Sequence, residues 1–148
     1  MREYPGGDSG RTRRVSRMLC LFGVLLLSAA CSGEERGDPA TWELRDPGAV
    51  SAESRSLDIG VQRLGCSSGV TGEVLEPRVS YKRDRIVIQV DVAPFRGAAN
   101  CPGNDSVPVT VVLSEPVGER DLVDGACLSG DAVSTAPCWE PVRWSRGG

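Results

Sequence analysis

The segment Arg85–Val92, with the sequence RIVIQVDV, constrains the fold more than any other part of the chain. Its β-branched residues Ile86, Ile88, Val90 and Val92 recur at every second position. Side chains of a β-strand point alternately to its two faces, so this period places the four residues on one face. The pattern therefore predicts a strand with one face buried in a core.

Three further segments show the same alternation of apolar residues, namely Leu57–Leu64, Val79–Lys82 and Val107–Leu113. Residues typical of turns separate them, and no stretch after residue 30 sustains a helical period. Pro108 cannot donate a ladder hydrogen bond, which predicts that its strand lies at a sheet edge or begins there. The sequence thus predicts an all-β fold, a small disulfide-bonded β-sandwich of immunoglobulin-like architecture with about six or seven strands. A tight hairpin is expected at KRDR, residues 82–85.

Residues 1–30 have the organisation of a secretory signal peptide. Four arginines between Arg11 and Arg17 precede the apolar stretch Met18–Leu27, which at ten residues is too short to cross a membrane as a helix. Small residues then lead to a cysteine in the sequence LSAAC, residues 27–31. An ordinary cleaved signal that leaves Cys31 free or disulfide-bonded is the alternative interpretation. The Arg13–Arg14 pair lacks the apolar residues that usually follow a twin-arginine signal, which favours general secretion.

The LSAAC sequence resembles the lipobox of bacterial lipoproteins. In that family the cysteine receives a diacylglycerol and, after cleavage, becomes the first residue of the mature protein. The resemblance implies lipidation at Cys31, with fatty acyl chains such as palmitate, and a location on the extracytoplasmic face of the cell membrane. A cysteine with two or more acyl chains would be a stable membrane anchor.

The lipidated cysteine and a flexible polar tether are predicted over residues 31–50, and the β-sandwich domain over residues 51–148. Trp42 and Leu44 share one face if the chain is extended there, so this segment could instead form a first edge strand. Without residues 1–30, which hold five arginines and two acidic residues, the net charge falls from −3 to −6. This acidic balance excludes a basic surface for nucleic acid.

Four cysteines remain once Cys31 is assigned to the anchor. An even number in an exported domain predicts two disulfides, with three possible pairings. We favour Cys66 with Cys101, and Cys127 with Cys138, because the first pair would link loops that flank predicted strands and the second would close a short C-terminal loop. A four-thiolate zinc site is the rival hypothesis, but the spacings contain no C-x2-C pair. No metal ion or other cofactor is predicted.

The sequence offers few residues for catalysis, and we predict that the protein is not an enzyme. The chain has no histidine, which removes the most common general base and metal ligand. Ser80 and Lys82 would share one strand face, but an exposed polar face explains them better than a nucleophile pair. The acidic residues of the segment 118–131 lack the alternate spacing of a calcium loop, which favours a solvated turn region; they are Glu119, Asp121, Asp124 and Asp131.

Three residues near predicted loops raise the question of binding or modification. Asn104 begins a glycosylation sequon, which in a bacterial lipoprotein we interpret as chance. Trp139 and Trp144 are expected to close the core rather than to form a binding patch. The motifs GCSSG, CPGN and LSEPVGERDLVDG are similar to those of small uncharacterised lipoproteins of actinomycetes, a resemblance that implies no known activity.

These features favour a lipid-anchored, non-enzymatic binding module of the cell envelope, with a protein or glycan partner and no nucleic acid. The ligand-binding residues are unknown, but the loops Asn100–Asp105 and Gly118–Gly125 are the first places to look for them. One alternative is an accessory or sensory subunit of a membrane complex. Another is a small envelope hydrolase, which would require two carboxylates facing each other across a cleft.

Overall fold

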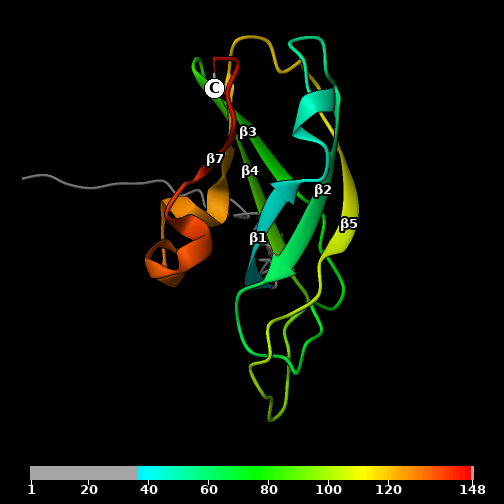
Figure 1. The fold of residues 1–148 in the computed structure, drawn as a ribbon, viewed down its shortest axis with the longest axis vertical. Coiled ribbons are helices and arrows are strands. Elements are labelled where there is room, and N and C mark those ends of the chain that lie inside the picture. The colour runs from blue at the N-terminus through cyan, green and yellow to red at the C-terminus, as the bar shows by residue number, and fades with distance from the viewer. Residues whose placement is uncertain (1–36, 148) are drawn as a thin grey trace, which may run out of the picture. The chain divides into compact units, whose positions relative to one another are not determined.

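The computed structural model describes residues 37–147 and shows a domain of strands joined by loops and short 3-10 helices (Figure 1). Its strands are β1 (Asp38–Leu44), β2 (Ser56–Arg63), β3 (Arg78–Tyr81), β4 (Arg85–Val92), β5 (Val107–Val112), β6 (Asp121–Asp124) and β7 (Val142–Trp144). The 3-10 helices are η1 (Pro47–Ala49), η2 (Gly125–Leu128), η3 (Asp131–Ser134) and η4 (Ala136–Cys138). None of the helices within residues 37–147 is long and apolar enough to cross a membrane. The prediction of a small all-β, disulfide-bonded, sandwich-like domain is confirmed.

The seven strands form one sheet, and β4 is the strand at which it branches. The strands follow the order β5-β2-β1-β4-β6-β7, and β3 also pairs with β4. One edge of β4 pairs with β3, while the other pairs first with β6, at Arg85–Ile88, and then with β1, at Val90–Val92. All pairings are antiparallel except that of β4 with β6. β6 and β1 therefore follow each other along one edge of β4, and the sheet forks there: β2 and β5 continue from β1, and β7 continues from β6.

The core is built from alternate residues of the strands. All four alternating residues of β4 are fully buried, as their period predicts. Leu57, Ile59 and Val61 of β2 are likewise at most 1% exposed. Burying a side chain of this size stabilises the fold by about 1.5–3 kcal/mol, so these two strands contribute much of the hydrophobic driving force.

The N-terminal strand β1 corrects the predicted domain boundary. The segment Asp38–Leu44 pairs with β2 on one side and, through Asp38–Ala40, with β4 on the other. Trp42 is 1% exposed and lies in the core. The domain therefore begins well before residue 51, and β1 is an inner strand rather than part of a tether or an edge strand. The predicted signal peptide and Cys31 lie outside the described residues.

Two local predictions are confirmed, the hairpin at residues 82–85 and the edge position of the strand that contains Pro108. β3 and β4 form a hairpin across residues 82–84, closed by a 2.8 Å hydrogen bond from the Lys82 amide to the Arg85 carbonyl. β5 lies at one end of the strand order, where Pro108 was expected. Pro108 faces Gly60 of β2 at a position whose N–H would point away from the sheet, so its missing donor costs no ladder bond.

Candidate functional site

Two disulfides join the loops at one side of the sheet. Cys66, just after β2, bonds to Cys101 in the loop before β5, and Cys127 of η2 bonds to Cys138 of η4. This is the pairing that the sequence favours. The first bridge spans 35 residues and the second spans 11. The first bridge joins the loop after β2 to the loop before β5, and the second closes the η2–η4 segment, so each limits the conformational freedom of the parts that it connects.

Side-chain hydrogen bonds fix the first of these loops further. The Asn104 side-chain amide donates to the carbonyl oxygens of Arg63, at 3.0 Å, and Gly65, at 2.7 Å. The Thr71 amide donates to an oxygen of Asp105 at 2.6 Å. Asn104 thus cross-links two loops, and this role explains the residue without the glycosylation that its sequon would suggest.

Between the disulfide-bonded loops, the outer face of β1 and β2 carries two adjoining hollows of about 380 and 310 Å³. Gln62 of β2 and Pro137 of η4 line both, so we treat them as one site, the outer groove. Gly60 shapes its floor, because a Cβ atom there would collide with the Ser106 side chain. The other polar side chains that line the groove are those of Thr41, Glu43, Arg63, Asn104 and Thr135.

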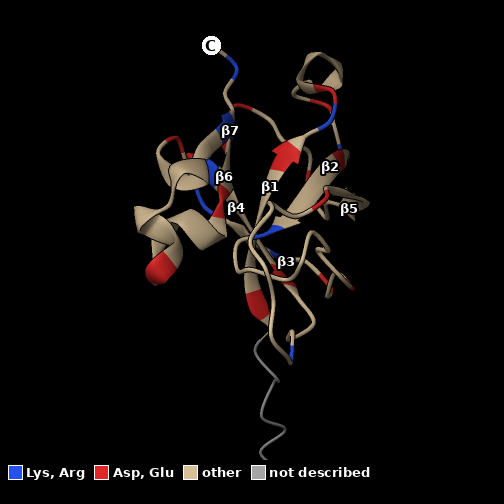
Figure 2. Cartoon of the chain, turned by 60° about the horizontal axis from the view of Figure 1, so that its bottom comes forward, with Lys and Arg blue, Asp and Glu red and all other residues tan. Residues whose placement is uncertain are grey.

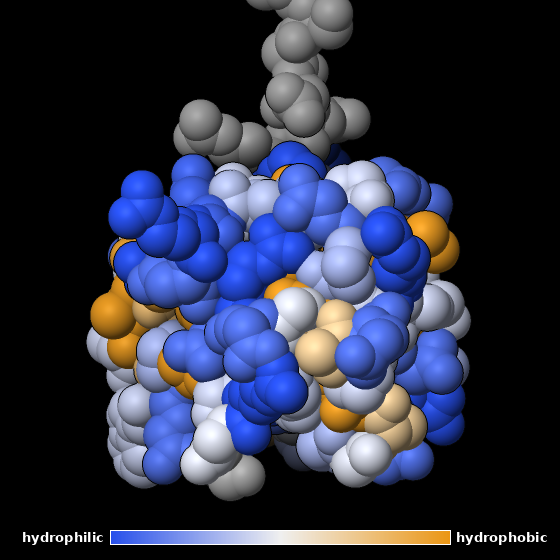
Figure 3. All heavy atoms as spheres, turned by 90° about the horizontal axis from the view of Figure 1, so that it is seen from above, coloured by the Kyte–Doolittle hydropathy of each residue, from blue (hydrophilic) through white to orange (hydrophobic). Residues whose placement is uncertain are grey.

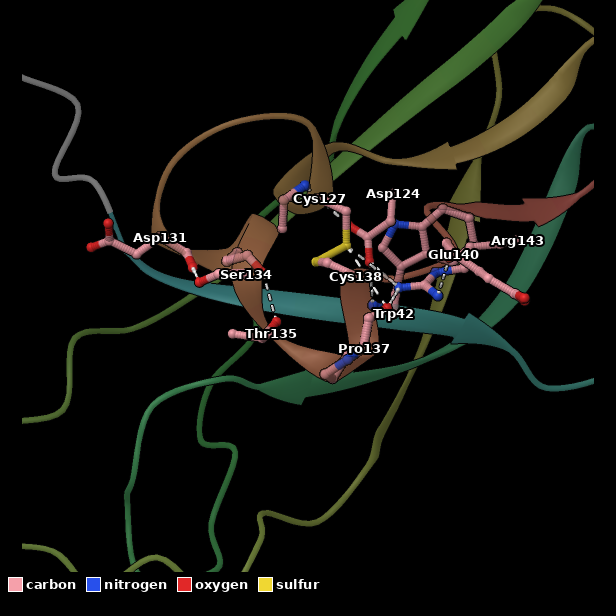
Figure 4. Close-up of a disulfide and its surroundings, with 12 residues drawn as sticks. Trp42, Asp124, Cys127, Asp131, Ser134, Thr135, Pro137, Cys138, Glu140 and Arg143 are labelled. Carbon is pink, nitrogen blue, oxygen red and sulfur yellow. Dashed lines mark hydrogen bonds and ion pairs between the residues drawn. A yellow bond between two sulfur atoms is a disulfide. The ribbon is translucent and has the colours of Figure 1, made fainter.

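The wall of the outer groove formed by the η2–η4 segment is attached to the sheet through Arg143 of β7 (Figure 4). The Arg143 guanidinium donates to the Asp124 carboxylate and to the Pro137 carbonyl, both at 2.9 Å. It also forms an ion pair of 2.8 Å with Glu43 of β1. One side chain therefore connects β1, the end of β6 and the wall formed by η2–η4, which we call the Pro137 wall.

Asp124 fills the fork where β1 and β6 leave the common edge of β4. Its carboxylate accepts hydrogen bonds from the backbone amides of Trp42 and Ala126, both at 3.0 Å. The second bond caps η2, and the first supplies the partner that β1 lacks where it departs from β4. The Trp42 indole N–H donates to the Ile88 carbonyl at 2.9 Å and closes the same fork from the core side.

Burial dominates the electrostatics of this cluster. It raises the pKa of Asp124, against the lowering effect of the Arg143 hydrogen bond and of the two amide donors. Desolvation also raises the pKa of Glu43, while Arg143 lowers it.

Elsewhere, acidic and basic residues are interspersed over loops and strand ends (Figure 2). The end of the domain that carries the β3–β4 turn and η1 is largely hydrophilic (Figure 3).

Within residues 37–147, the residues that were considered for catalysis or metal binding do not form a site. Ser80 and Lys82 are both exposed. Among residues 37–147, no three acidic or cysteine side chains gather as a metal site would require. In the acidic segment 118–131, Glu119 forms an ion pair with Arg146 and Asp131 is exposed, but the predicted solvated turn is wrong for Asp121–Asp124, which form β6. Of the described residues, only one carboxylate, that of Glu43, lines the outer groove, so no facing carboxylate pair lies there.

Of the two loops that were expected to carry binding residues, one lines the outer groove and the other does not. Asn100–Asp105 contributes Cys101, Gly103 and Asn104 to the outer groove. Gly118–Gly125 contributes no lining residue to it, because its Leu122–Asp124 portion is buried in β6.

The prediction for Trp139 is wrong. Its side chain is 77% exposed, although it directly follows the buried Cys138. Trp144 does pack against the core, from β7. Sequence reasoning also missed the two buried arginines, Arg63 and Arg143. A signal for Arg63 was present, since it follows Ile59 and Val61 on the inward phase of β2.

Comparison with protein-family models, with curated proteins and with solved structures finds no match to this chain.

Proposed function

We propose that this protein is a lipid-anchored, extracytoplasmic binding module that recognises a protein or glycan of the cell envelope through its outer groove. The observation that carries the proposal is the placement of this groove between two disulfide-bonded parts of the chain. One is the pair of loops after β2 and before β5, which Cys66–Cys101 joins, and the other is the η2–η4 segment, which Cys127–Cys138 closes. A hollow with fixed walls can bind without a large loss of conformational entropy. Hydroxyl and amide side chains, those of Thr41, Gln62 and Thr135, provide hydrogen-bonding groups in it.

The anchor rests on the leader sequence. The LSAAC sequence supports cleavage before Cys31 and attachment of acyl chains to its thiol. Few residues separate Cys31 from Asp38, where β1 begins, so the domain would be held close to the membrane surface. Replacement Cys31→Ala is expected to abolish labelling by a fatty-acid analogue and lipoprotein-type cleavage; a variant that still labels would refute the anchor.

Binding is tested by photo-crosslinking in intact cells. A photoreactive amino acid at Gln62, which is exposed in the outer groove, should give a reproducible crosslinked species. The matched control carries the same amino acid at Ser80, which is exposed on β3 and lines neither hollow. A species formed from Gln62 and not from Ser80 supports the proposal. The same species from both positions, or none from Gln62, contradicts it.

A further inference from the structure

The free edge of β5 presents backbone donors that no strand among residues 37–147 uses. The Leu113 amide donates to the Arg55 carbonyl at 2.8 Å, next to β2. Amides alternate in direction along a strand, so those of Thr110 and Val112 point away from β2. β5 is the last strand in the sheet order. Beyond it, the outward amide of Ser114 already donates to the Tyr81 hydroxyl of β3 at 2.8 Å.

The outer edge of β3 faces the same side of the domain. The Lys82 amide bonds to Arg85 of β4, so by the same alternation the amides of Val79 and Tyr81 point away from β4. The antiparallel pairings connect β3, β4, β1, β2 and β5 in turn. β3 and β5 consequently run in the same direction, and one strand placed between them would be antiparallel to both.

A hollow of about 240 Å³ separates these two edges, and it exposes about as much polar as apolar surface. Its lining consists of Val74, Leu75, Glu76, Pro77, Val79 and residues 109–112, and we call it the edge groove. Val74, Val79 and Val109 are core residues that are only partly buried, so the core is accessible here. Val112 is 77% exposed on the outer face of β5.

We infer that the edge groove binds one extended segment of a partner polypeptide, which adds to β5 as an antiparallel strand. The amides of Thr110 and Val112 and the carbonyls of the same edge would bond to its backbone, as in strand addition generally. Its alternate apolar side chains would fill the hollow against Val79 and Val109.

Charge indicates the chemistry of that segment. Glu76 is the one charged residue that lines the edge groove within the described chain, and Asp58 lies behind Thr110, accepting a 2.7 Å hydrogen bond from its hydroxyl. The nearby Arg78 is engaged by Asp91 at 2.7 Å. Neither carboxylate forms an ion pair within residues 37–147, and this favours a segment with a lysine or arginine between its apolar residues. A second copy fits poorly, because β5 itself carries no basic residue and Pro108 interrupts its edge donors.

The test uses the protein as its host cell produces it and a fluorescein-labelled synthetic peptide, TVKVTVT. Fluorescence anisotropy should show saturable binding. Val112→Pro removes the outward donor while leaving the ladder to β2 intact, and we expect it to weaken binding about tenfold or more. Val112→Ala, which keeps the donor, should change binding by less than about threefold. Thermal unfolding of both variants shows that each remains folded, as Pro108 in the same strand suggests.

A charge exchange gives a second, independent readout. Glu76→Lys should weaken TVKVTVT several-fold and strengthen the reversed peptide TVEVTVT. The inference is overturned if neither peptide binds at about 1 mM, if Val112→Pro and Val112→Ala behave alike, or if sedimentation shows self-association through β5 that Val112→Pro abolishes. None of these outcomes depends on the outer groove, so the proposed function stands or fails separately.

Discussion

The side chains of Arg63 and Arg143 are both buried in this domain, but they differ in the groups with which they pair. Their side chains are 3% and 5% exposed. Arg63 donates to two backbone carbonyl oxygens, and its carboxylate partner Asp38 is 39% exposed. Arg143 pairs instead with Asp124, whose side chain is completely buried. Water can reach the carboxylate partner of Arg63, whereas Arg143 pairs with the completely buried Asp124 in addition to the exposed Glu43.

This difference decides what happens when the arginine of each pair is removed. A buried charge left without its partner is strongly destabilising, whereas a partly exposed one can be hydrated. Around Arg143, the loss spreads to β1, η2 and the Pro137 wall, since Asp124 and Arg143 connect all three. Substitution of Arg63 should therefore lower the free energy of unfolding less than substitution of Arg143.

The largest effect is expected from Asp124→Ala. It removes the acceptor of two backbone amides and leaves Arg143 with a buried charge, so the free energy of unfolding should fall by about 4–5 kcal/mol. Denaturant unfolding measures this. The matched control is Asp121→Ala, in the same strand but partly exposed, which should change stability by about 0.5 kcal/mol. Equal losses for the two variants would contradict the account of this cluster.

The two disulfides should differ in the order of their loop lengths. Replacing Cys66 and Cys101 together by alanine is expected to lower stability by about 4 kcal/mol, and replacing Cys127 and Cys138 together by about 3 kcal/mol. The same unfolding experiment applies. If the shorter bridge proved the more important by a clear margin, attachment of the wall would depend on the disulfide more than on Arg143.

Substituting each arginine by methionine sharpens the comparison through pH. At pH 7 we expect Arg143→Met to cost about 3 kcal/mol and Arg63→Met about 2 kcal/mol. Burial raises the pKa of Asp124, and loss of Arg143 removes an influence that lowers it. Because the pKa of Asp124 is raised in the folded state, its protonated form stabilises the fold. This stabilisation is fully present below the pKa of the unfolded state, about 3.9, and is lost as the pH rises through the pKa of the folded state.

The cost of Arg143→Met should accordingly shrink by about 1 kcal/mol or more between pH 7 and pH 4, as Asp124 takes up a proton. The cost of Arg63→Met should change much less, because Asp38 is accessible to water. Urea unfolding at the two pH values provides the data. Parallel pH dependence of the two variants would show that the arginines are equivalent after all.

The smallest effect is expected for Glu43→Gln. The Glu43 side chain is 69% exposed, so its ion pair with Arg143 is screened by water and contributes about 0.5 kcal/mol. Thermal unfolding should therefore show a change near the limit of detection. A loss comparable to that of Asp124→Ala would mean that Glu43, rather than Asp124, is the principal partner of Arg143.

Four strands, β2 to β5, could be predicted from the sequence because each depends on a local pattern. The alternation in β4 gave its buried face, and Pro108 gave the edge position of β5. The place of β1 could not be predicted, because its short apolar pattern fits an exposed tether segment as well as an inner strand. Only the fork closed by Asp124 and Trp42 shows why it lies inside the sheet.

The candidate site was only partly predictable. Asn100–Asp105 was identified by its turn residues, and it does line the outer groove. The role of Arg143 depends on contacts with Glu43 and Asp124, which are 100 and 19 residues away along the chain and which no local pattern reveals. The parallel pairing of β4 with β6 is a similar case, since alternation within a strand carries no information on its neighbour's direction.

The claim that Arg143, through Asp124, holds the Pro137 wall on the sheet can be tested by hydrogen exchange. Mass spectrometry would follow peptides from residues 131–140 in the native chain and in Arg143→Met, with β2 and β4 peptides as internal references. We predict at least about tenfold faster exchange in 131–140 for Arg143→Met, and no selective change there for Arg63→Met. Unchanged protection of residues 131–140 in Arg143→Met would contradict the claim.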